Sequence, residues 1–476
     1  MPHAEMKKHY NIGLFLTAEH SCYNAAFGFA NALQSRGHSV IFLVNEGSLF
    51  IDYVKDNGFG VIEILPITES VYSVTKQSIV SKFNLWRRLT RHSPSVLLKQ
   101  QRLVHLIKEN NLDIFFIDDV RNDVNLYAVA LAKNKIPTAL ISYTFSSQFS
   151  SDYPPIFSSR IPSGKGRPNV FYRALYRWLW GWTISTKGRI YSYALVDFLK
   201  QSFKKFFDQI RDIGFERELR QFGWGSAWSE WKRRPLIPQV VFGHHMMDWP
   251  AIKSNPARCY FGTSDLWRKK PDFDWSRLDL SKPVIYCNIS TTGGFGSDRV
   301  SSGNGRKNRG VILSKRNQMA KRYLEVVLAC FSSQQDWQLL LACGSFSEVL
   351  VQDQYPSNIH IFERLPQLAV LEKANLAITW GGAGTVRECI NSGVPMLVFP
   401  AWTDQFGNAA RVFAKRTGLR GNIQNVTSSQ MTEMVQYALT DETINTSIKA
   451  MREQCSVESD ILELVRFVKK HLNFQL

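Results

Sequence analysis

The stretch LPQLAVLEKANLAITWGGAGTVRECINSGVPMLVFPAWTDQFGNAARV, residues 365–412, decides the fold of this chain. An apolar, strand-like run ends at Thr379, glycines follow (among them Gly382 and Gly384), and a helical pattern begins at about Thr385. Glycine lets the backbone turn tightly and approach a ligand closely. A helix that starts beside strand tips offers free N–H groups and a positive dipole end. The pattern is therefore typical of a diphosphate site.

The same residues also have a purely structural interpretation. Thr385 and Glu388 stand three residues apart at the start of the helical pattern, which fits a helix capping box. Two glycines before a helix can also form nothing more than a turn. Taken alone, the glycines leave both interpretations open.

Strand-like and helical segments alternate on both sides of this stretch. Such alternation predicts an α/β fold with parallel sheets. Two separate series predict two facing doubly wound Rossmann-like domains that bind ligands in an interdomain cleft, outside the carboxyl ends of the strands. The expected elements are, in the first series, 11–16, 25–36, 39–44, 113–117, 126–133 and 138–142, and in the second, 283–290, 318–330, 337–342, 359–362, 368–373, 376–379, 385–392, 396–399 and 408–417.

The break between the two series divides the chain. We expect an N-terminal domain over residues 1–248, with an aromatic and basic helical insertion at about 165–235, and a C-terminal domain over 249–455. Apolar residues at helical spacing in 456–476 predict a final helix that crosses back to the first domain. The Gly-, Ser- and Arg-rich stretch 293–310 is expected to be a loop, either a solvated insertion or a flap over bound phosphates.

Composition and charge narrow the classes of function. Lys and Arg number 58 against 40 Asp and Glu, which gives a formal net charge of +18, and aromatic residues reach 13%. This charge attracts anions such as nucleotide phosphates, anionic lipid or nucleic acid, and charge alone does not choose among them. The hydrophobic fraction of 44% excludes wholesale disorder, collagen and coiled coil.

The cysteines and histidines give no sign of a metal site. The seven cysteines are scattered without a CxxC pair, which indicates buried thiols in a reducing compartment. His244 and His245 are adjacent, and adjacent side chains on a strand point to opposite faces, so a linker role is favoured over a shared metal. Neither a spanning apolar run nor a cleavable signal is found. We expect a cytoplasmic protein, with peripheral membrane contact as an alternative.

Taken as a whole, residues 365–412 resemble the donor-binding signature of the UDP-glycosyltransferase-like family, which are nucleotide-sugar glycosyltransferases of the GT-B fold. A weaker resemblance extends over most of the chain. The matching residues form one ordered series, Leu365-Pro366-Gln367, Leu371, Gly381-Gly382, Gly384-Thr385, Glu388, Gly393-Val394-Pro395, Pro400, Asp404-Gln405 and Asn408-Ala409.

The resemblance implies contacts to the nucleotide diphosphate. Gly382, Gly384 and Thr385 would contact the diphosphate, and Glu388 would accept hydrogen bonds from the ribose hydroxyls. Gln367 would lie near the base.

The resemblance also implies contacts to the sugar. Asp404 and Gln405 would hold its hydroxyls, because a carboxylate beside an amide can accept from and donate to vicinal hydroxyls. A polar loop tip is the plainer interpretation of this pair.

Two donor positions differ from the family pattern. Trp380 stands where the family usually has a His that touches a phosphate, and an indole N–H can donate one hydrogen bond but carries no charge. Arg364 stands where a base-stacking Trp is common, and a guanidinium can still stack on a base. We expect both residues in the donor site. Trp380 also motivates the alternative that the protein is a sugar-nucleotide-binding pseudoenzyme.

In this family the loop after the first strand carries the catalytic base, and here His20 occupies that place. A neutral imidazole within ~3 Å of an acceptor hydroxyl can remove its proton, and a carboxylate would orient the ring. Asp118 and Asp119 follow the later strand that would supply this carboxylate, and Asp119 is preferred because it lies further into the loop. A helix-start histidine and an N-cap or surface carboxylate are the structural alternatives.

The resemblance implies an inverting glycosyltransferase of natural-product type. It would move a sugar from a nucleotide diphosphate sugar to a hydroxyl or amine of a hydrophobic or amphipathic small molecule. A UDP-sugar is the first donor we expect. No metal or cofactor is implied beyond this co-substrate. The family chooses its acceptor through the N-terminal domain, so 165–235 is the expected acceptor region, or else simply helices packed on their own sheet. A membrane-surface enzyme with a lipid acceptor is an alternative, whereas nucleic acid is not expected.

Overall fold

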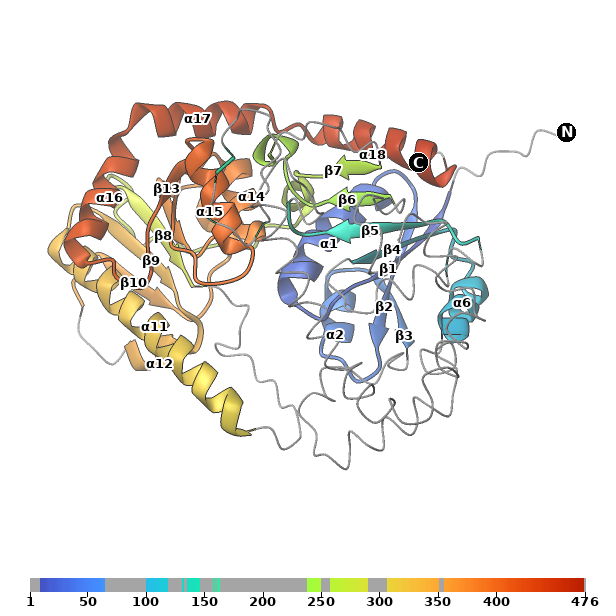
Figure 1. Cartoon of the computed structure of the whole chain (residues 1–476), viewed down its shortest axis with the longest axis horizontal. Helices are drawn as coiled ribbons and strands as arrows, with labels where there is room; N and C mark the ends of the chain where they lie inside the picture. The colour runs from blue at the N-terminus through green and yellow to red at the C-terminus, as the bar shows by residue number, and fades with distance from the viewer. Residues whose placement is uncertain are drawn as a thin grey trace, which may run out of the picture.

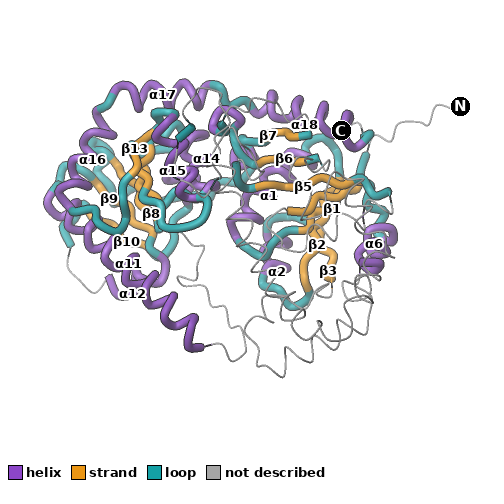
Figure 2. The backbone as a smooth tube through the Cα atoms, viewed as in Figure 1, coloured by secondary structure: helices purple, strands orange, loops and turns teal. Residues whose placement is uncertain are grey.

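The computed structural model describes residues 9–64, 100–118, 131, 135–145, 156, 159, 161–162, 238–249, 257–289, 306–350 and 355–474. Within them the chain forms two parallel β-sheets, each accompanied by helices, that lie beside one another (Figures 1 and 2). The predicted α/β fold with two Rossmann-like domains is confirmed. The expected insertion at 165–235 lies outside the described residues.

The N-terminal domain is built on a seven-stranded parallel sheet with the order β3-β2-β1-β4-β5-β6-β7. Its strands read as short, almost continuous apolar runs because both faces are covered. The strands are β1 (Asn11–Phe15), β2 (Ser39–Asn45), β3 (Gly60–Ile64), β4 (Ile114–Asp118), β5 (Thr138–Ser142), β6 (Gln239–Val241) and β7 (Arg258–Tyr260). The accompanying helices are α1 (His20–Gln34), α2 (Phe50–Asp56), α6 (Gln100–Glu109) and the 3-10 turns η1 (His245–Met247) and η2 (Ser264–Trp267).

The C-terminal domain repeats this plan with a six-stranded parallel sheet of order β10-β9-β8-β11-β12-β13. The strands are β8 (Val284–Asn288), β9 (Gln338–Ala342), β10 (Ile359–Phe362), β11 (Leu376–Thr379), β12 (Met396–Val398) and β13 (Gly418–Arg420). The helices are α11 (Arg306–Ser333), η3 (Gly344–Phe346), α12 (Ser347–Leu350), α13 (Gln367–Leu371), α14 (Ala383–Ser392), α15 (Gln405–Ala414), α16 (Ser428–Thr440) and α17 (Glu442–Glu453).

The strand orders fix where ligands can bind. In each sheet the direction of winding reverses between two neighbouring strands, β1 and β4 in the first sheet and β8 and β11 in the second. Open parallel sheets bind ligands outside the carboxyl ends of the strands at this switch point. The topology therefore directs attention to the loops that follow these four strands.

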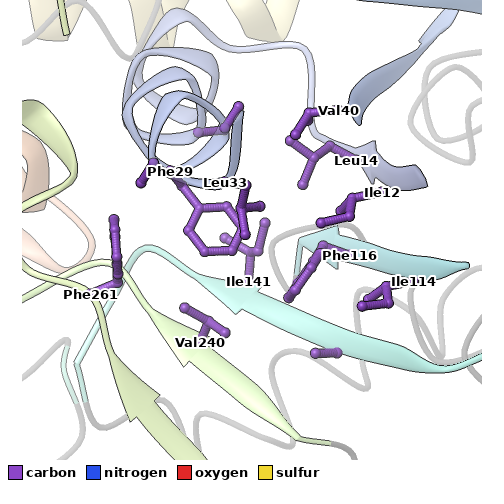
Figure 3. Close-up of a cluster of buried hydrophobic side chains, with 14 of the residues drawn as sticks. Ile12, Leu14, Phe29, Leu33, Val40, Ile114, Phe116, Ile141, Val240 and Phe261 are labelled. Atoms are coloured by element: carbon purple, nitrogen blue, oxygen red, sulfur yellow. The ribbon is translucent and has the colours of Figure 1, made fainter. Parts of the chain in front are cut away.

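The core of the first domain lies between its sheet and helix α1. Leu14 and Phe116 from the two central strands pack with Phe29 and Leu33 of α1, and all four side chains are fully buried (Figure 3). Apolar residues recur on one face of α1 at helical spacing, which is the pattern that seats a helix on a sheet.

The last helix, α18 (Val457–Leu472), lies on the first domain although it follows the second in sequence (Figure 1). Leu464, Phe467 and Val468 are buried in the same cluster as the core of the first sheet. Asp460 at the start of α18 also accepts hydrogen bonds of 2.8 Å from the backbone N–H and the hydroxyl of Thr263. The C-terminal segment thus ties the two domains together.

Three local features differ from the expectations. The first sheet includes β7, which lies beyond the domain boundary expected at residue 249. Helix α11 begins at Arg306, inside the stretch expected to be a loop through residue 310, because Arg and Lys are good helix formers that tolerate one glycine. His245 lies in a 3-10 turn with His244 as its N-cap, so neither histidine is on a strand.

Candidate functional site

The glycine-rich turn after β11 leaves open space at the start of helix α14. Gly381 has φ +83°, a left-handed conformation that favours glycine, and Gly382 is the N-cap of the helix. A Cβ added to Gly382 or Gly384 would meet no atom of the described structure within 4 Å. An anion can therefore reach the backbone N–H groups and the positive end of α14 at this point.

Asp404 is the N-cap of helix α15, and its carboxylate lies beside the first residue of α14. Its carboxylate accepts 2.9 Å hydrogen bonds from the Thr403 hydroxyl and the Asn408 amide. Burial raises the pKa of Asp404, while these two bonds and the backbone N–H of Ala383, the first residue of α14, oppose the rise. A predicted sugar-binding carboxylate thus stands directly beside the glycine turn.

Gln405, the partner predicted for Asp404, is almost fully buried. Its side-chain oxygen accepts hydrogen bonds from the backbone N–H groups of Ala401 at 2.9 Å and Trp402 at 3.1 Å. This amide oxygen therefore holds the loop that precedes α15. The sugar contact of Gln405 stays a prediction.

Glu388, one turn into α14, is held by two partners. One carboxylate oxygen is 3.0 Å from Nη1 of Arg268, and the other accepts a 2.6 Å hydrogen bond from Nε2 of Gln367. Burial and the negative Asp265 raise the pKa of Glu388, whereas the positive Arg268 lowers it. The structure thus brings together Gln367 and Glu388, two of the predicted donor residues.

A second set of polar groups extends from Gln367 to the tip of β8. The side-chain oxygen of Gln367 accepts from the hydroxyl of Tyr286 at 2.9 Å and from Nδ2 of Asn288 at 3.0 Å. Nε2 of Gln367 lies 3.3 Å from the hydroxyl of Thr385. The network therefore joins the tip of β8 and the start of α13 to helix α14.

Trp380 lies inside the core of the second domain. Its side chain is fully buried and packs edge-on against Tyr323 and Trp402, with ring centroids 6.2 and 4.9 Å apart. A large indole at this position fills space between the sheet and α11. Its predicted contact with a donor phosphate remains a prediction, as does the stacking of Arg364 on the base.

In the first domain His20 is the first residue of α1 and follows the loop after β1. Its ring lies 4.9 Å, between centroids, from both Phe50 and Tyr53 of α2. Partial burial lowers the pKa of His20, and the positive charge of Arg364 lowers it further. Both effects favour the neutral imidazole, which is the form a general base requires.

Asp118, at the end of β4, supports the loop that leads to His20. It is fully buried and accepts hydrogen bonds from both the backbone N–H and, at 3.0 Å, the hydroxyl of Thr17. Asp119, the preferred candidate to orient His20, lies outside the described residues. Its role stays a prediction.

The two halves of the site face one another across the domain boundary. The charge of Arg364 acts on His20, and the charges of Arg268 and Arg364 both lower the pKa of Tyr53, whose net shift is upward because of burial. Arg364 belongs to the second domain and Arg268 pairs with Glu388 of that domain, whereas His20 and Tyr53 belong to the first domain. The strand tips of both sheets therefore contribute to one region.

Several residues of this region were not foreseen from the sequence. Arg268, Tyr286 and Asn288 belong to no motif, and only the position of Asn288 at a strand end could have indicated it. Phe50 and Tyr53 touch His20 through a helix whose orientation the sequence does not give.

The described residues include no group of three or more His, Cys, Asp or Glu side chains placed to bind a metal ion. His244 is buried with its ring nitrogen Nδ1 3.5 Å from Sγ of Cys455. Among the helices that the structure describes, none is both long and apolar enough to cross a membrane.

Two Rossmann-like domains with a glycine turn in the second define a GT-B protein, and comparison with solved structures agrees. The glycotransferase of kitacinnamycin superposes with a TM-score of 0.63 at 17% identity, over 98% of this chain and 100% of that one. The calicheamicin glycosyltransferase CalG4 superposes with a TM-score of 0.63 at 16% identity, over 98% of this chain and 99% of that one. The spinosyn rhamnosyltransferase SpnG, complexed with thymidine diphosphate, superposes with a TM-score of 0.56 at 13% identity, over 96% of this chain and 100% of that one.

Sequence comparison finds similarity to glycosyltransferases, strongest in the second domain. Residues 340–469 match the erythromycin biosynthesis protein CIII-like, C-terminal domain. NDP-glycosyltransferase YjiC of Bacillus subtilis is 33% identical over 138 residues, which are 28% of this chain and 35% of that protein. The oleandomycin glycosyltransferase of Streptomyces antibioticus is 23% identical over 299 residues, 54% of this chain and 68% of that one. These relatives are glycosyltransferases, and the chain is similar to them over only about a third of the length of the first two.

Proposed function

We propose that this protein is an inverting glycosyltransferase that uses a nucleotide diphosphate sugar as donor. One observation carries the proposal. At the strand tips of the second sheet, an open glycine turn lies beside the carboxylate of Glu388, which accepts a hydrogen bond from the amide of Gln367. His20 lies on the opposite domain, and it is close enough to Arg364 for the positive charge of Arg364 to lower the pKa of its imidazole. Nucleoside diphosphate binding by the neighbour SpnG supports the donor class.

The proposed reaction is a single displacement. His20 takes the proton of the acceptor hydroxyl as its oxygen bonds to the anomeric carbon of the sugar. The bond from that carbon to the diphosphate breaks with its electron pair on the leaving oxygen, and the configuration inverts. Backbone N–H groups at the start of α14 stabilise the charge that develops on the diphosphate, so no metal is required.

We propose a UDP-sugar as donor and a hydrophobic or amphipathic small molecule as acceptor. The aromatic side chains of Phe50 and Tyr53 beside His20 suit an apolar aglycone. The name of the oleandomycin glycosyltransferase supports the same class of acceptor. We also propose a cytoplasmic location.

The test is a transfer assay with UDP-, dTDP-, GDP- and ADP-glucose, each with a panel of phenolic and macrolide aglycones, in the presence of a chelator. The proposal predicts a glucosylated product by mass spectrometry with at least one donor, and a β-linkage by NMR from the α-configured donor. An α-linked product would contradict the inverting mechanism. No product with any combination would contradict the proposed activity.

A sugar-nucleotide-binding pseudoenzyme is the second candidate. Full burial of Trp380 at the position of the family His and the occupied amide oxygen of Gln405 favour it. In that case a nucleoside diphosphate would stabilise the protein although no donor is turned over.

A further inference from the structure

Arg268 forms an ion pair with the Glu388 carboxylate, and it comes from outside the donor signature. It directly follows the turn η2, and its Nη1 lies 3.0 Å from an oxygen of Glu388. The Glu388 side chain is 9% exposed and that of Arg268 21%, so little water screens the pair. Burial disfavours the charge on Glu388, and Arg268 is the stronger of the two guanidinium groups, with Arg387, that favour the ionised carboxylate.

The ionised carboxylate sets the direction of the hydrogen bonds beyond it. Because Glu388 can only accept, the amide of Gln367 must turn its nitrogen toward Glu388, at 2.6 Å. The oxygen of Gln367 then faces Tyr286 and Asn288, both of which must donate to it. One charge thus fixes the orientation of two amide side chains.

The result is a site lined by hydrogen-bond acceptor oxygens. The remaining side-chain oxygen of Asn288 is buried and has no hydrogen-bond partner within the described part of the chain. Glu388 keeps lone pairs that its two partners do not use. Both acceptors stand at the switch point of the second sheet, so a ligand bound there must offer hydroxyl donors rather than further acceptors.

Arg268 is itself held by the first domain. In the turn before it, the carbonyl oxygen of Trp267 accepts a 2.8 Å hydrogen bond from Asn31 of α1. The carbonyl oxygen of Ser264 packs so closely on Gly28 that a Cβ there would be 1.5 Å away. The guanidinium is therefore presented to Glu388 from a fixed position.

We propose that Arg268 is a positioning residue that makes this site select nucleotides with a complete ribose over their 2′-deoxy counterparts. By holding Glu388 as an acceptor and orienting Gln367 and Asn288, it prepares oxygens for the two ribose hydroxyls. The inference rests on the proposed function, because it concerns the same donor site. The fold alone does not decide this preference, since the neighbour SpnG was solved with thymidine diphosphate, whose sugar lacks the 2′-hydroxyl.

The experiment measures dissociation constants for nucleoside diphosphates and their 2′-deoxy forms by calorimetry, with UDP and 2′-deoxy-UDP first and the ADP and GDP pairs beside them. The wild type should prefer the ribose form by at least about tenfold, as expected for a hydrogen bond to a charged group. Arg268→Met should reduce the ratio to within about threefold. Arg268→Lys, which keeps the charge, should restore most of it.

The control is Lys270→Met, which removes a cation of the same segment from the exposed pair with Glu372. It should leave the ratio at the wild-type value. Because each ratio compares two ligands on one variant, a loss of folded protein cancels. A wild-type ratio near one, or a full ratio in Arg268→Met, would overturn the inference and leave the proposed function standing. If the wild type binds none of the six nucleotides, the proposed function fails and the inference fails with it.

Discussion

At the residue scale, the account depends first on His20. Replacing it by Ala removes the group that takes the acceptor proton, so we expect turnover to fall by at least ~100-fold. The dissociation constant of the donor should change little, because His20 lies on the other domain. Steady-state kinetics with calorimetry separates the two effects. Unchanged turnover would remove His20 from the mechanism.

Arg364 should tune the pH dependence of His20. Its positive charge, together with partial burial, lowers the pKa of the imidazole. Arg364→Gln removes the charge, so the pKa of His20 should rise and the acidic limb of kcat/KM should move to higher pH. Salt screens this exposed cation, so the shift should shrink in high salt.

The control for this prediction is Lys373→Gln, which removes a cation packed over Trp275 and not on His20. It should leave the acidic limb in place. A limb that moves to lower pH in Arg364→Gln, or does not move, would contradict the assignment.

The sequence predicted those site residues that lie in one continuous signature. Gln367, Thr385 and Glu388 are brought together because α13, β11 and α14 are consecutive and short. Arg268 and Asn288 were missed because their roles depend on packing between segments far apart in the chain. The burial of Trp380 depends likewise on α11, which the local sequence around Trp380 does not reveal.

At the element scale, the donor helix α14 is fixed to the turn η2 by a buried ion pair. Arg387 and Asp265 are 2.7 Å apart, with side chains 4% and 1% exposed. Arg387→Met would leave the Asp265 carboxylate buried without its cation, so we expect a loss of about 3–5 kcal/mol in the free energy of unfolding. Urea denaturation measures it.

The exposed pair of Lys270 and Glu372 is the control, because it joins the segment after η2 to the end of α13 in the second domain. Lys270→Met should cost no more than about 1 kcal/mol. Equal costs for Arg387→Met and Lys270→Met would show that the buried pair does not secure α14.

The turn after β6 should make the stability of the protein sensitive to acid. Burial lowers the pKa of His244 from 6.5 to about 4. Between these two pH values His244 is protonated in the unfolded chain but not in the folded chain. The free energy of unfolding therefore falls as the pH drops from 6.5 towards 4. The pKa difference corresponds to at most about 3 kcal/mol. Unfolding free energies measured across this pH range test it.

His244→Gln should flatten this pH dependence, because Gln does not titrate. His245→Gln is the control, since His245 is exposed and its charge contributes least to the low pKa of His244, so the slope should change only slightly. An undiminished slope in His244→Gln would assign the acid sensitivity to other groups.

Elements were predicted well where hydrophobic periodicity and glycine signals agree. Strands β10 and β11 and the end of α14 lie where the apolar runs place them, because each run is bounded by turn residues. Strand β7 was missed because three residues give too short a pattern, and its place in the first sheet depends on pairing with β6. The start of α11 was misjudged because glycine and serine in the preceding stretch outweighed its basic helix formers.

At the scale of the whole molecule, α18 joins the last residues to the first domain. Phe467 is 5% exposed within the core cluster of the first sheet, so Phe467→Ala should cost about 3–5 kcal/mol. On the same helix Leu462 is 49% exposed, and Leu462→Ala should change the free energy of unfolding by no more than about 0.5 kcal/mol. Similar values for the two variants would contradict the packing of α18 on the first domain.

The central claim is that the glycine turn of the second domain holds a nucleotide diphosphate, and thermal unfolding with UDP, dTDP, GDP and ADP tests it most directly. A nucleotide at 100 times its dissociation constant should stabilise the wild type by about 2.7 kcal/mol. Gly382→Val would fill the open space at the start of α14 while keeping an ordinary backbone, with φ −59°. The account predicts a clear shift with at least one nucleotide for the wild type and none for Gly382→Val. No shift in the wild type, or an equal shift in Gly382→Val, would contradict it.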